Sequence, residues 1–388
     1  MEMTATKGTR KKNVPRLLYI DNLRILLISL VIATHTAITY GGVGSWYYID
    51  AGTGLLAPHL LSLLTALNQS FFMGAFILIS AYFIPGSLLR KGHARYARDR
   101  LVRLGIPLAI WVFLLAPVLL YIALSASGEN PGMFAGFWAS CFVQQSSAMF
   151  GPMWFVAFLL LATSAYLAWT RFFPPAVPGD HPPAAFPGVP VLVGIGLALG
   201  LVTALVRLAF PIGSVWLFGF QFPFFPQYIA FFILGIVAAQ NNWFDTIPRP
   251  VGKTCALFAL ILVIAEPVLL FILTGSPAGI AAVRGGFTWQ AVIFAFWEQM
   301  AGVMITIGLL WVFSLRFTSQ GTVARAMAGD TYTVYIIHPF IVVSLAIALS
   351  AVAIPALAKF AIVLPLAVVL AFTVAHLIRA IPGVNRVL

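Results

Sequence analysis

Charged residues are scarce in this sequence of 388 residues: 8% are Asp, Glu, Lys or Arg, whereas 61% are hydrophobic. An average soluble domain has roughly 25% charged residues. So few charges cannot cover the surface of a 42.0 kDa globule, and the mean hydropathy of +1.01 agrees. A water-soluble domain is therefore excluded. Apolar runs of about 20 residues, without the alternation of barrel strands, predict an all-α integral membrane protein.

Cysteine and acidic residues are also few. Cys141 and Cys255 are too far apart and too few for a disulfide framework or a thiolate metal site. No metal cofactor is expected. Ten acidic residues against 22 basic ones give a net charge of +12, so the position of the basic residues becomes informative.

About ten apolar windows, punctuated by Pro, Gly or charged residues, predict about ten transmembrane helices. A basic cytoplasmic tail (1–17) precedes a single transmembrane domain (18–388), and the Pro-rich linker 172–190 joins spans one to four to spans five to ten. The predicted limits are 18–40, 59–84, 104–125, 151–171, 190–210, 222–240, 254–274, 288–313, 331–352 and 357–378.

The basic residues predict the orientation. With both termini in the cytoplasm, all of the 22 Lys and Arg residues except Arg207, Arg284 and Lys359 lie on the cytoplasmic side or in the helix ends that face it. The positive charge is then explained by topology and by anionic lipid headgroups, without a nucleic-acid partner. We expect a multi-pass protein of the bacterial cytoplasmic (inner) membrane.

Ionisable residues within spans are costly in lipid and tend to be functional. In the first span, Arg24 and His35 are eleven residues apart, which places them on one helical stripe with a rise of about 16.5 Å. Asp21 lies one turn before Arg24, where it can orient the guanidinium. The alternative is an arginine that snorkels to the interface and a histidine that bonds a neighbouring helix.

A basic cluster follows the second span. Arg100 and Arg103 form an R-x-x-R pair, with Arg98 nearby, at the start of the third span. Two adjacent guanidinium groups suit phosphate oxygens, which they can bind bidentately. The alternative is that the cluster only fixes topology and that Asp99 pairs with Arg103.

Two further polar residues lie in later spans. His338 precedes Pro339 in the ninth span, and this proline frees a backbone carbonyl and permits a kink beside the imidazole. A packed, hydrogen-bonded histidine is equally consistent with the sequence. Glu298 lies near the middle of the eighth span, where a carboxylate needs a partner, and His35 is the attractive one.

Five motifs follow one another along nearly the whole chain: Arg24-x10-His35, Arg100-x-x-Arg103-Leu-Gly-Ile-Pro, Gly151-Pro-Met-Trp154-Phe155, YIAFFILGI (228–236) and YIIHPF (335–340). In this order they resemble the membrane-bound acyltransferase-3 family, in particular the branch that contains the periplasmic glucan-modifying protein C. One departure is Ala81, where many members have glycine after the serine.

The resemblance implies an O-acyltransferase that moves an acyl group from cytoplasmic acyl-CoA to a hydroxyl of an extracytoplasmic saccharide or related acceptor. Acetyl-CoA is the expected donor from family frequency, and succinyl-CoA is suggested by the branch. The family's functional arginine and histidine carry over onto Arg24 and His35, with His35 as the general base. His338 and Glu298 are further catalytic candidates. The CoA phosphates would be held by Arg100 and Arg103, with Arg98 and Arg24 as helpers. The candidate oxyanion donors are Ser80, Trp154 and His338.

Three alternatives stay open. His35 could form a covalent acyl-imidazole instead of acting as a base. The chain could be a transporter of a lipid-linked saccharide or an anion, with Arg24, His35 and Glu298 forming a coupling pathway. It could also be a non-catalytic membrane subunit that binds a partner enzyme. The sequence leaves the acyl group, the acceptor and the oligomeric state open.

Overall fold

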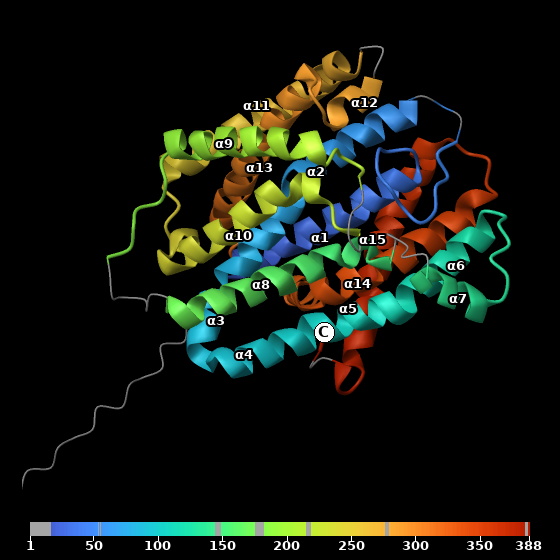
Figure 1. The fold of residues 1–388 in the computed structure, drawn as a ribbon, viewed down its shortest axis with the longest axis horizontal. Helices are drawn as coiled ribbons and strands as arrows, with labels where there is room; N and C mark the ends of the chain where they lie inside the picture. The colour runs from blue at the N-terminus through green and yellow to red at the C-terminus, as the bar shows by residue number, and fades with distance from the viewer. Residues whose placement is uncertain are drawn as a thin grey trace, which may run out of the picture.

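The structure, a computed structural model, is a helical bundle in which the long helices lie side by side (Figure 1). Within the described residues, ten helical stretches are long and apolar enough to cross a membrane, as the sequence predicts. The basic tail up to residue 16 and part of the Pro-rich linker lie outside the described residues, which are 17–52, 54, 56–143, 149–174, 182–214, 219–275, 279–384 and 387–388.

The predicted spans coincide with observed helices, but several helices are longer than predicted. The second span continues through α3 to Lys91, and the ninth begins at Thr322, because their ends are polar and an apolar window cannot detect them. Two short apolar helices were not predicted as spans, α7 (Phe134–Val143) and α12 (Gly279–Arg284). The spanning helices are α1 (Leu18–Thr39), α2 (Leu56–Tyr82) with α3 (Ile84–Lys91), α4 (His93–Arg100) continued by α5 (Ile106–Ile110) and α6 (Ala116–Ala126), α8 (Trp154–Phe172), α9 (Val189–Ala209), α10 (Phe225–Gln240), α11 (Arg249–Thr274), α13 (Trp289–Arg316), α14 (Thr322–Ser350) and α15 (Ala356–Ala380).

The helix of the third span departs twice from regular α-helical geometry. It contains π-helical turns at Leu101–Gly105 and Trp111–Leu115, and each precedes a proline, Pro107 and Pro117. Proline has no N–H to donate to the preceding turn, so the backbone must rearrange there. Single π turns of this kind occur frequently at functional sites.

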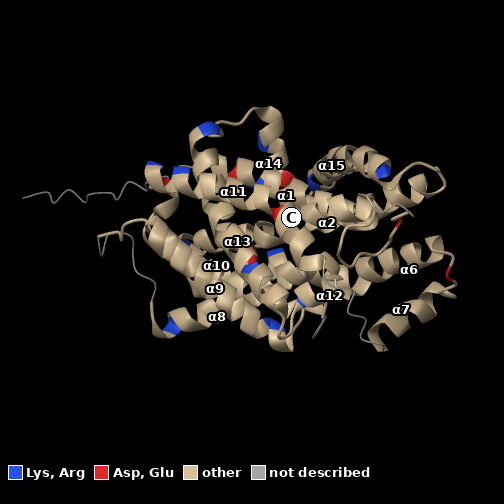
Figure 2. Ribbon diagram, turned by 90° about the horizontal axis from the view of Figure 1, so that it is seen from above, with Lys and Arg blue, Asp and Glu red and all other residues tan. Residues whose placement is uncertain are grey.

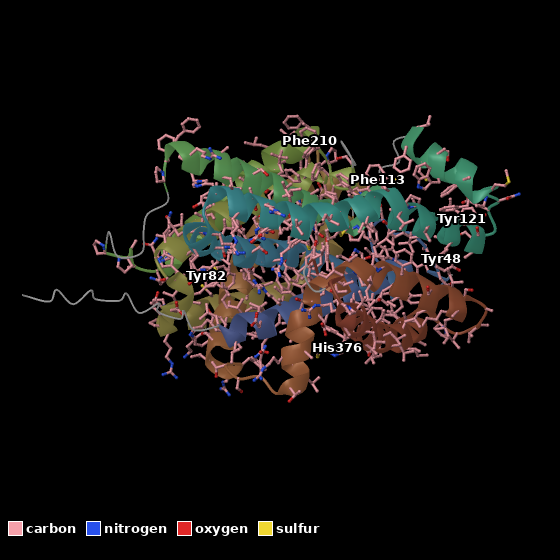
Figure 3. All side chains as sticks on the ribbon, turned by 90° about the horizontal axis from the view of Figure 1, so that it is seen from below. Tyr48, Tyr82, Phe113, Tyr121, Phe210 and His376 are labelled. Carbon is pink, nitrogen blue, oxygen red and sulfur yellow. The ribbon has the colours of Figure 1, made fainter. Side chains whose placement is uncertain are left out.

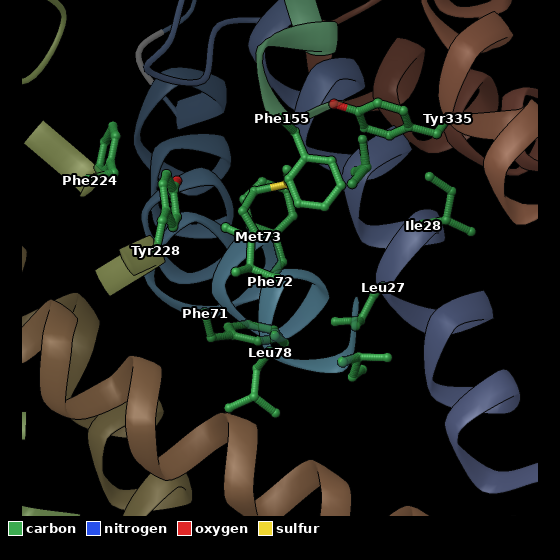
Figure 4. Packing of buried hydrophobic residues seen from close by; sticks show 14 of the residues in the cluster. Leu27, Ile28, Phe71, Phe72, Met73, Leu78, Phe155, Phe224, Tyr228 and Tyr335 are labelled. Carbon is green, nitrogen blue, oxygen red and sulfur yellow. The ribbon is translucent and has the colours of Figure 1, made fainter. Parts of the chain in front are cut away.

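Burial separates inner helices from outer ones. The inner group is α1, α2 and α13, whose apolar windows are 61%, 67% and 78% buried, whereas the window of α11 is 17% buried and lies at the outside of the bundle. The side chains between the inner helices form one apolar core. Figure 4 shows Phe155 of α8 and Tyr335 of α14 converging above Phe72 and Met73 of α2.

The departure at Ala81 lies where α2 and α10 approach closely. Gly235 on α10 packs against the Leu78 carbonyl oxygen and the Ala81 methyl group, and any side chain at Gly235 would collide with both. Small residues permit such close helix packing in lipid. Here the glycine is supplied by α10, which leaves room for alanine on α2.

Charged side chains form a few isolated patches on an otherwise uncharged ribbon (Figure 2). The labelled residues of Figure 3 separate the two ends of the bundle: Tyr48 and Tyr121 lie toward one end, and Tyr82 toward the other. The first end holds the connection between the first two spans, and by the positive-inside prediction it is the outer end.

Candidate active site

His35 of α1 and His338 of α14 meet inside the bundle. Nδ1 of His35 lies 2.9 Å from Nε2 of His338, and the two rings are nearly parallel with centroids 5.0 Å apart. His338 is completely buried, whereas His35 is half-buried. The sequence singles out both histidines, but it gives no sign that they form a pair.

Hydrogen bonding fixes the tautomers of the pair. Nδ1 of His338 lies 2.7 Å from the Tyr335 carbonyl oxygen. A carbonyl only accepts, so Nδ1 of neutral His338 carries the proton and its Nε2 carries a lone pair. His35 must then donate from Nδ1 to His338. The lone pair of neutral His35 is left on Nε2, the tautomer that a general base needs.

Trp46 covers one face of the pair. Its indole stacks on the His35 imidazole with ring centroids 3.9 Å apart and an interplanar angle of 13°, and it lies 6.0 Å from the His338 ring. Its Nε1–H is buried and has no hydrogen-bond partner among the described residues. Trp46 was not predicted as a site residue, because an aromatic residue in a connection has no helical periodicity to mark it.

The R-x-x-R cluster lies where α4 passes into the first π-helical turn. Arg100 donates from Nε to the Tyr96 hydroxyl at 2.7 Å and stacks on the same ring. Arg103 and Arg98 are exposed. Asp99 accepts from Lys91 at 2.5 Å, so the expected pairing of Asp99 with Arg103 is replaced by one with a lysine, and the guanidinium of Arg103 is exposed.

A tyrosine ties this cluster to the helix that carries His338. The Tyr332 hydroxyl donates to the Arg103 carbonyl oxygen at 2.9 Å. Tyr332 and His338 are six residues apart on α14, a rise of about 9 Å. One helix therefore joins the basic cluster and the imidazole pair, which makes the two features parts of one candidate site.

Arg24 stays near the end of α1 that the sequence predicts to be cytoplasmic. Its Nη1 lies 3.4 Å from an Asp21 carboxylate oxygen, and its guanidinium lies over the Phe83 ring, 5.1 Å from the centroid. The expected neighbour Asp21 is confirmed. The Arg24 side chain is 29% exposed, so it can still reach a ligand.

Glu298 does not meet His35, which corrects the pairing favoured by sequence. Its Oε2 accepts from Arg207 Nη2 at 2.5 Å and from the Gln299 amide at 3.0 Å. Both members of the ion pair are essentially completely buried. Arg207 and Glu298 come from α9 and α13. Arg207 neutralises the charge of the Glu298 carboxylate, so Glu298 is not a partner of His35.

The candidate oxyanion donors Ser80, Trp154 and His338 belong to three different helices. Trp154 stacks on Tyr228, with centroids 5.3 Å apart, and Ser80 is half-buried on α2. Both ring nitrogens of His338 are already engaged. Trp46, which the sequence did not suggest as a donor, has a buried N–H without a hydrogen-bond partner among the described residues.

A further buried acidic residue, Asp330, was not identified from the sequence. Asp330, buried on α14, accepts from Arg379 Nη1 at 2.6 Å, and its other oxygen lies 3.0 Å from Nδ1 of His376. His376 and Arg379 both contact this carboxylate from α15. His376 lies at the edge of the molecule (Figure 3), so this cluster joins the last two helices away from the imidazole pair.

Comparison with known proteins supplies the family. The sequence profile described as an acyltransferase domain matches residues 17–377. Glucans biosynthesis protein C of Salmonella gallinarum (strain 287/91) is 26% identical over 258 residues, which cover 65% of this chain and 65% of that relative's length. No solved structure matches the chain. Within the described residues, no group of three or more His, Cys, Asp or Glu side chains is arranged to hold a metal ion.

Proposed function

The chain belongs to the acyltransferase-3 family, and on that premise we propose that it transfers an acyl group from acyl-CoA to a hydroxyl of a saccharide-related acceptor. The observation that carries this proposal is the hydrogen-bond chain from His35 through His338 to the Tyr335 carbonyl. It leaves a basic lone pair on Nε2 of His35, and a hydroxyl needs such a base to become a nucleophile.

His35 moves the proton in this scheme. The acceptor hydroxyl donates to Nε2 of His35 while its oxygen attacks the thioester carbon. The C–O bond forms, the C–S bond breaks, and the proton on Nε2 passes to the departing CoA thiolate. His338 is not the oxyanion donor but a positioning residue, since Nε2 of His338 accepts from the Nδ1–H of His35 throughout.

The basic cluster would bind the donor. Arg103 and Arg98 present exposed guanidinium groups, and Arg100 is held in place by Tyr96. Arg24 adds a half-buried cation on α1. Such groups suit the phosphates of CoA, while its long arm would carry the thioester along α14 toward His338. This arrangement requires the predicted orientation, with both termini in the cytoplasm.

Trp46 would stabilise the developing charge. Attack on a thioester places negative charge on the carbonyl oxygen, which requires a preorganised donor. The Nε1–H of Trp46 is buried, has no hydrogen-bond partner in the part of the chain that the structure describes, and belongs to a ring stacked against His35. We assign this N–H, in place of Ser80 or Trp154, as an oxyanion donor.

The name of the relative bears on the acceptor. Because it is a glucans biosynthesis protein, we propose a polysaccharide or other glycan outside the inner membrane as the acceptor class. Acetyl is the first acyl group to test, as O-acetylation, and succinyl is the second. Transport is less well supported, because Glu298, one of the three residues of that hypothesis, is paired with Arg207.

The test uses purified full-length protein in detergent. Release of free thiol from acetyl-CoA and succinyl-CoA is measured with and without envelope glycans, for the native chain, His35→Ala and Arg100→Ala/Arg103→Ala. We expect His35→Ala to lose about 10²- to 10⁴-fold in rate and the arginine double variant to require more acyl-CoA for half-maximal rate.

A matched control removes two cations elsewhere. Arg249→Ala/Lys253→Ala alters a basic pair in the first turns of α11 and should leave the acyl-CoA requirement unchanged. Thiol release that persists in His35→Ala would defeat the assignment of the base. If the native chain neither binds nor consumes acyl-CoA, the transferase proposal fails, and flux in liposomes becomes the next experiment.

A further inference from the structure

The connection between the first two helices folds over the imidazole pair. Residues 41–50, which we call the cover, carry Trp46 against His35 and bury Tyr48 to 8% exposure. Tyr47 packs edge-on against Trp46, with centroids 5.2 Å apart. In Figure 3, Tyr48 lies at the end of the bundle opposite Tyr82. The cover thus closes the predicted outer side of the candidate site.

The two ends of the cover are fixed differently. Near its beginning, the Val43 amide donates to the Ser62 hydroxyl of α2 at 3.1 Å. At its end, the Asp50 amide donates to the Thr39 carbonyl at 2.7 Å, and the Asp50 carboxylate accepts from Nζ of Lys359 at 2.7 Å. Lys359 belongs to α15, which is far from the first helices in sequence.

Lys359 is an unusual residue for its position. Its side chain is 6% exposed near the start of an apolar spanning helix, and its Nζ also donates to the Ser350 carbonyl at 3.2 Å. Burying an ammonium group is costly unless it is paired. The ion pair between Lys359 and Asp50 therefore fixes the end of the cover to the bundle.

We propose that the Asp50–Lys359 ion pair holds the cover closed over His35, and that both residues are positioning residues that keep Trp46 stacked on the imidazole. The proposal rests on the proposed function for its effect on transfer. Neither charge reaches His35; they act through the path of the chain between Asp50 and Trp46. Release of the ion pair removes the side-chain tie at this end and leaves the bond from the Asp50 amide to the Thr39 carbonyl, so the cover loosens, Trp46 leaves the ring and Tyr48 becomes accessible.

The first test measures closure without substrate. In a background of Cys141→Ala and Cys255→Ala, Tyr48→Cys reports whether the cover is closed, through its reaction rate with a membrane-impermeant maleimide. We expect Lys359→Met and Asp50→Asn to raise this rate about tenfold, since either change removes the ion pair and Asp50→Asn also leaves the buried Lys359 ammonium without its carboxylate. The charge exchange Asp50→Lys/Lys359→Asp should restore slow labelling. Lys253→Met, which removes an exposed lysine elsewhere, should not change it.

The second test measures transfer. Lys359→Met should lower kcat for thiol release about tenfold with little change in the KM for acyl-CoA, because the proposed phosphate site is at the other end of the bundle. The exchange variant should recover most of kcat. Unchanged labelling in both single variants, or faster labelling with native kcat, would overturn the proposal. A native chain that releases no thiol would defeat only the proposed function, because labelling requires no substrate.

Discussion

Pro339 leaves the carbonyl oxygen of Tyr335, four residues earlier in α14, without its helical donor, because proline has no N–H. His338 occupies that acceptor with Nδ1 at 2.7 Å. The helix continues through Pro339 from Thr322 to Ser350, so the expected freed carbonyl is confirmed and a side chain satisfies it. Because this bond sets the tautomer of His338, and through it that of His35, the proline helps to define the base.

Pro339→Ala tests this relationship. The new N–H can bond the Tyr335 carbonyl and compete with His338, so the tautomer of the pair is no longer fixed. We expect kcat for thiol release to fall roughly tenfold, about 1.4 kcal/mol in the barrier, without loss of folded protein. The control is Pro365→Ala, which changes the interior proline of α15. A native rate in Pro339→Ala would show that the freed carbonyl is dispensable.

Transfer should depend on pH with a definite sign. Both imidazoles must be neutral for the bonds seen here, and a proton on Nε2 of His35 removes the attacking lone pair. The value of kcat/KM should therefore fall as pH is lowered and reach a plateau at higher pH, with a midpoint that belongs to the coupled pair. Thermal unfolding measured over the same pH range separates this loss from denaturation. A rate that increases toward acid pH would contradict a neutral base.

Trp46→Phe separates stacking from hydrogen bonding. Phenylalanine keeps an aromatic face for His35 but lacks the indole N–H. We expect a loss of about 10²- to 10³-fold in kcat, typical of removing one oxyanion donor, with acyl-CoA binding retained. The comparison variant is Trp154→Phe, which keeps the stack on Tyr228 and should remain near the native rate. If the two variants behave alike, Trp46 acts by packing alone.

The Arg207–Glu298 pair should matter for stability more than for chemistry. Arg207→Leu leaves a buried carboxylate without its partner, and breaking such a pair costs about 3–5 kcal/mol, so the unfolding temperature should drop sharply. The double variant Arg207→Leu/Glu298→Leu should recover much of that loss because no charge stays buried alone. Thermal unfolding in detergent and thiol release are measured on the same samples. A stable but inactive double variant would return Glu298 to the catalytic candidates.

The helices themselves follow from local sequence. Lipid demands about 20 apolar residues per span with internally satisfied backbone groups, and this constraint acts on each segment separately. The ten predicted spans are therefore confirmed. The polar ends, such as the beginning of α14 before Asp330, were missed because a helix that leaves the hydrocarbon core no longer has an apolar signature.

The site required the tertiary structure. The sequence by itself determined that His35, His338, Glu298 and the R-x-x-R arginines lie in or at the membrane, since polar groups in apolar runs are visible one at a time. It did not determine their partners. His35 meets His338 across 303 residues, Glu298 meets Arg207 across 91, and Trp46 reaches His35 because its connection folds back. Such pairings depend on how helices pack, and packing in lipid is decided by shape and hydrogen bonding between distant segments.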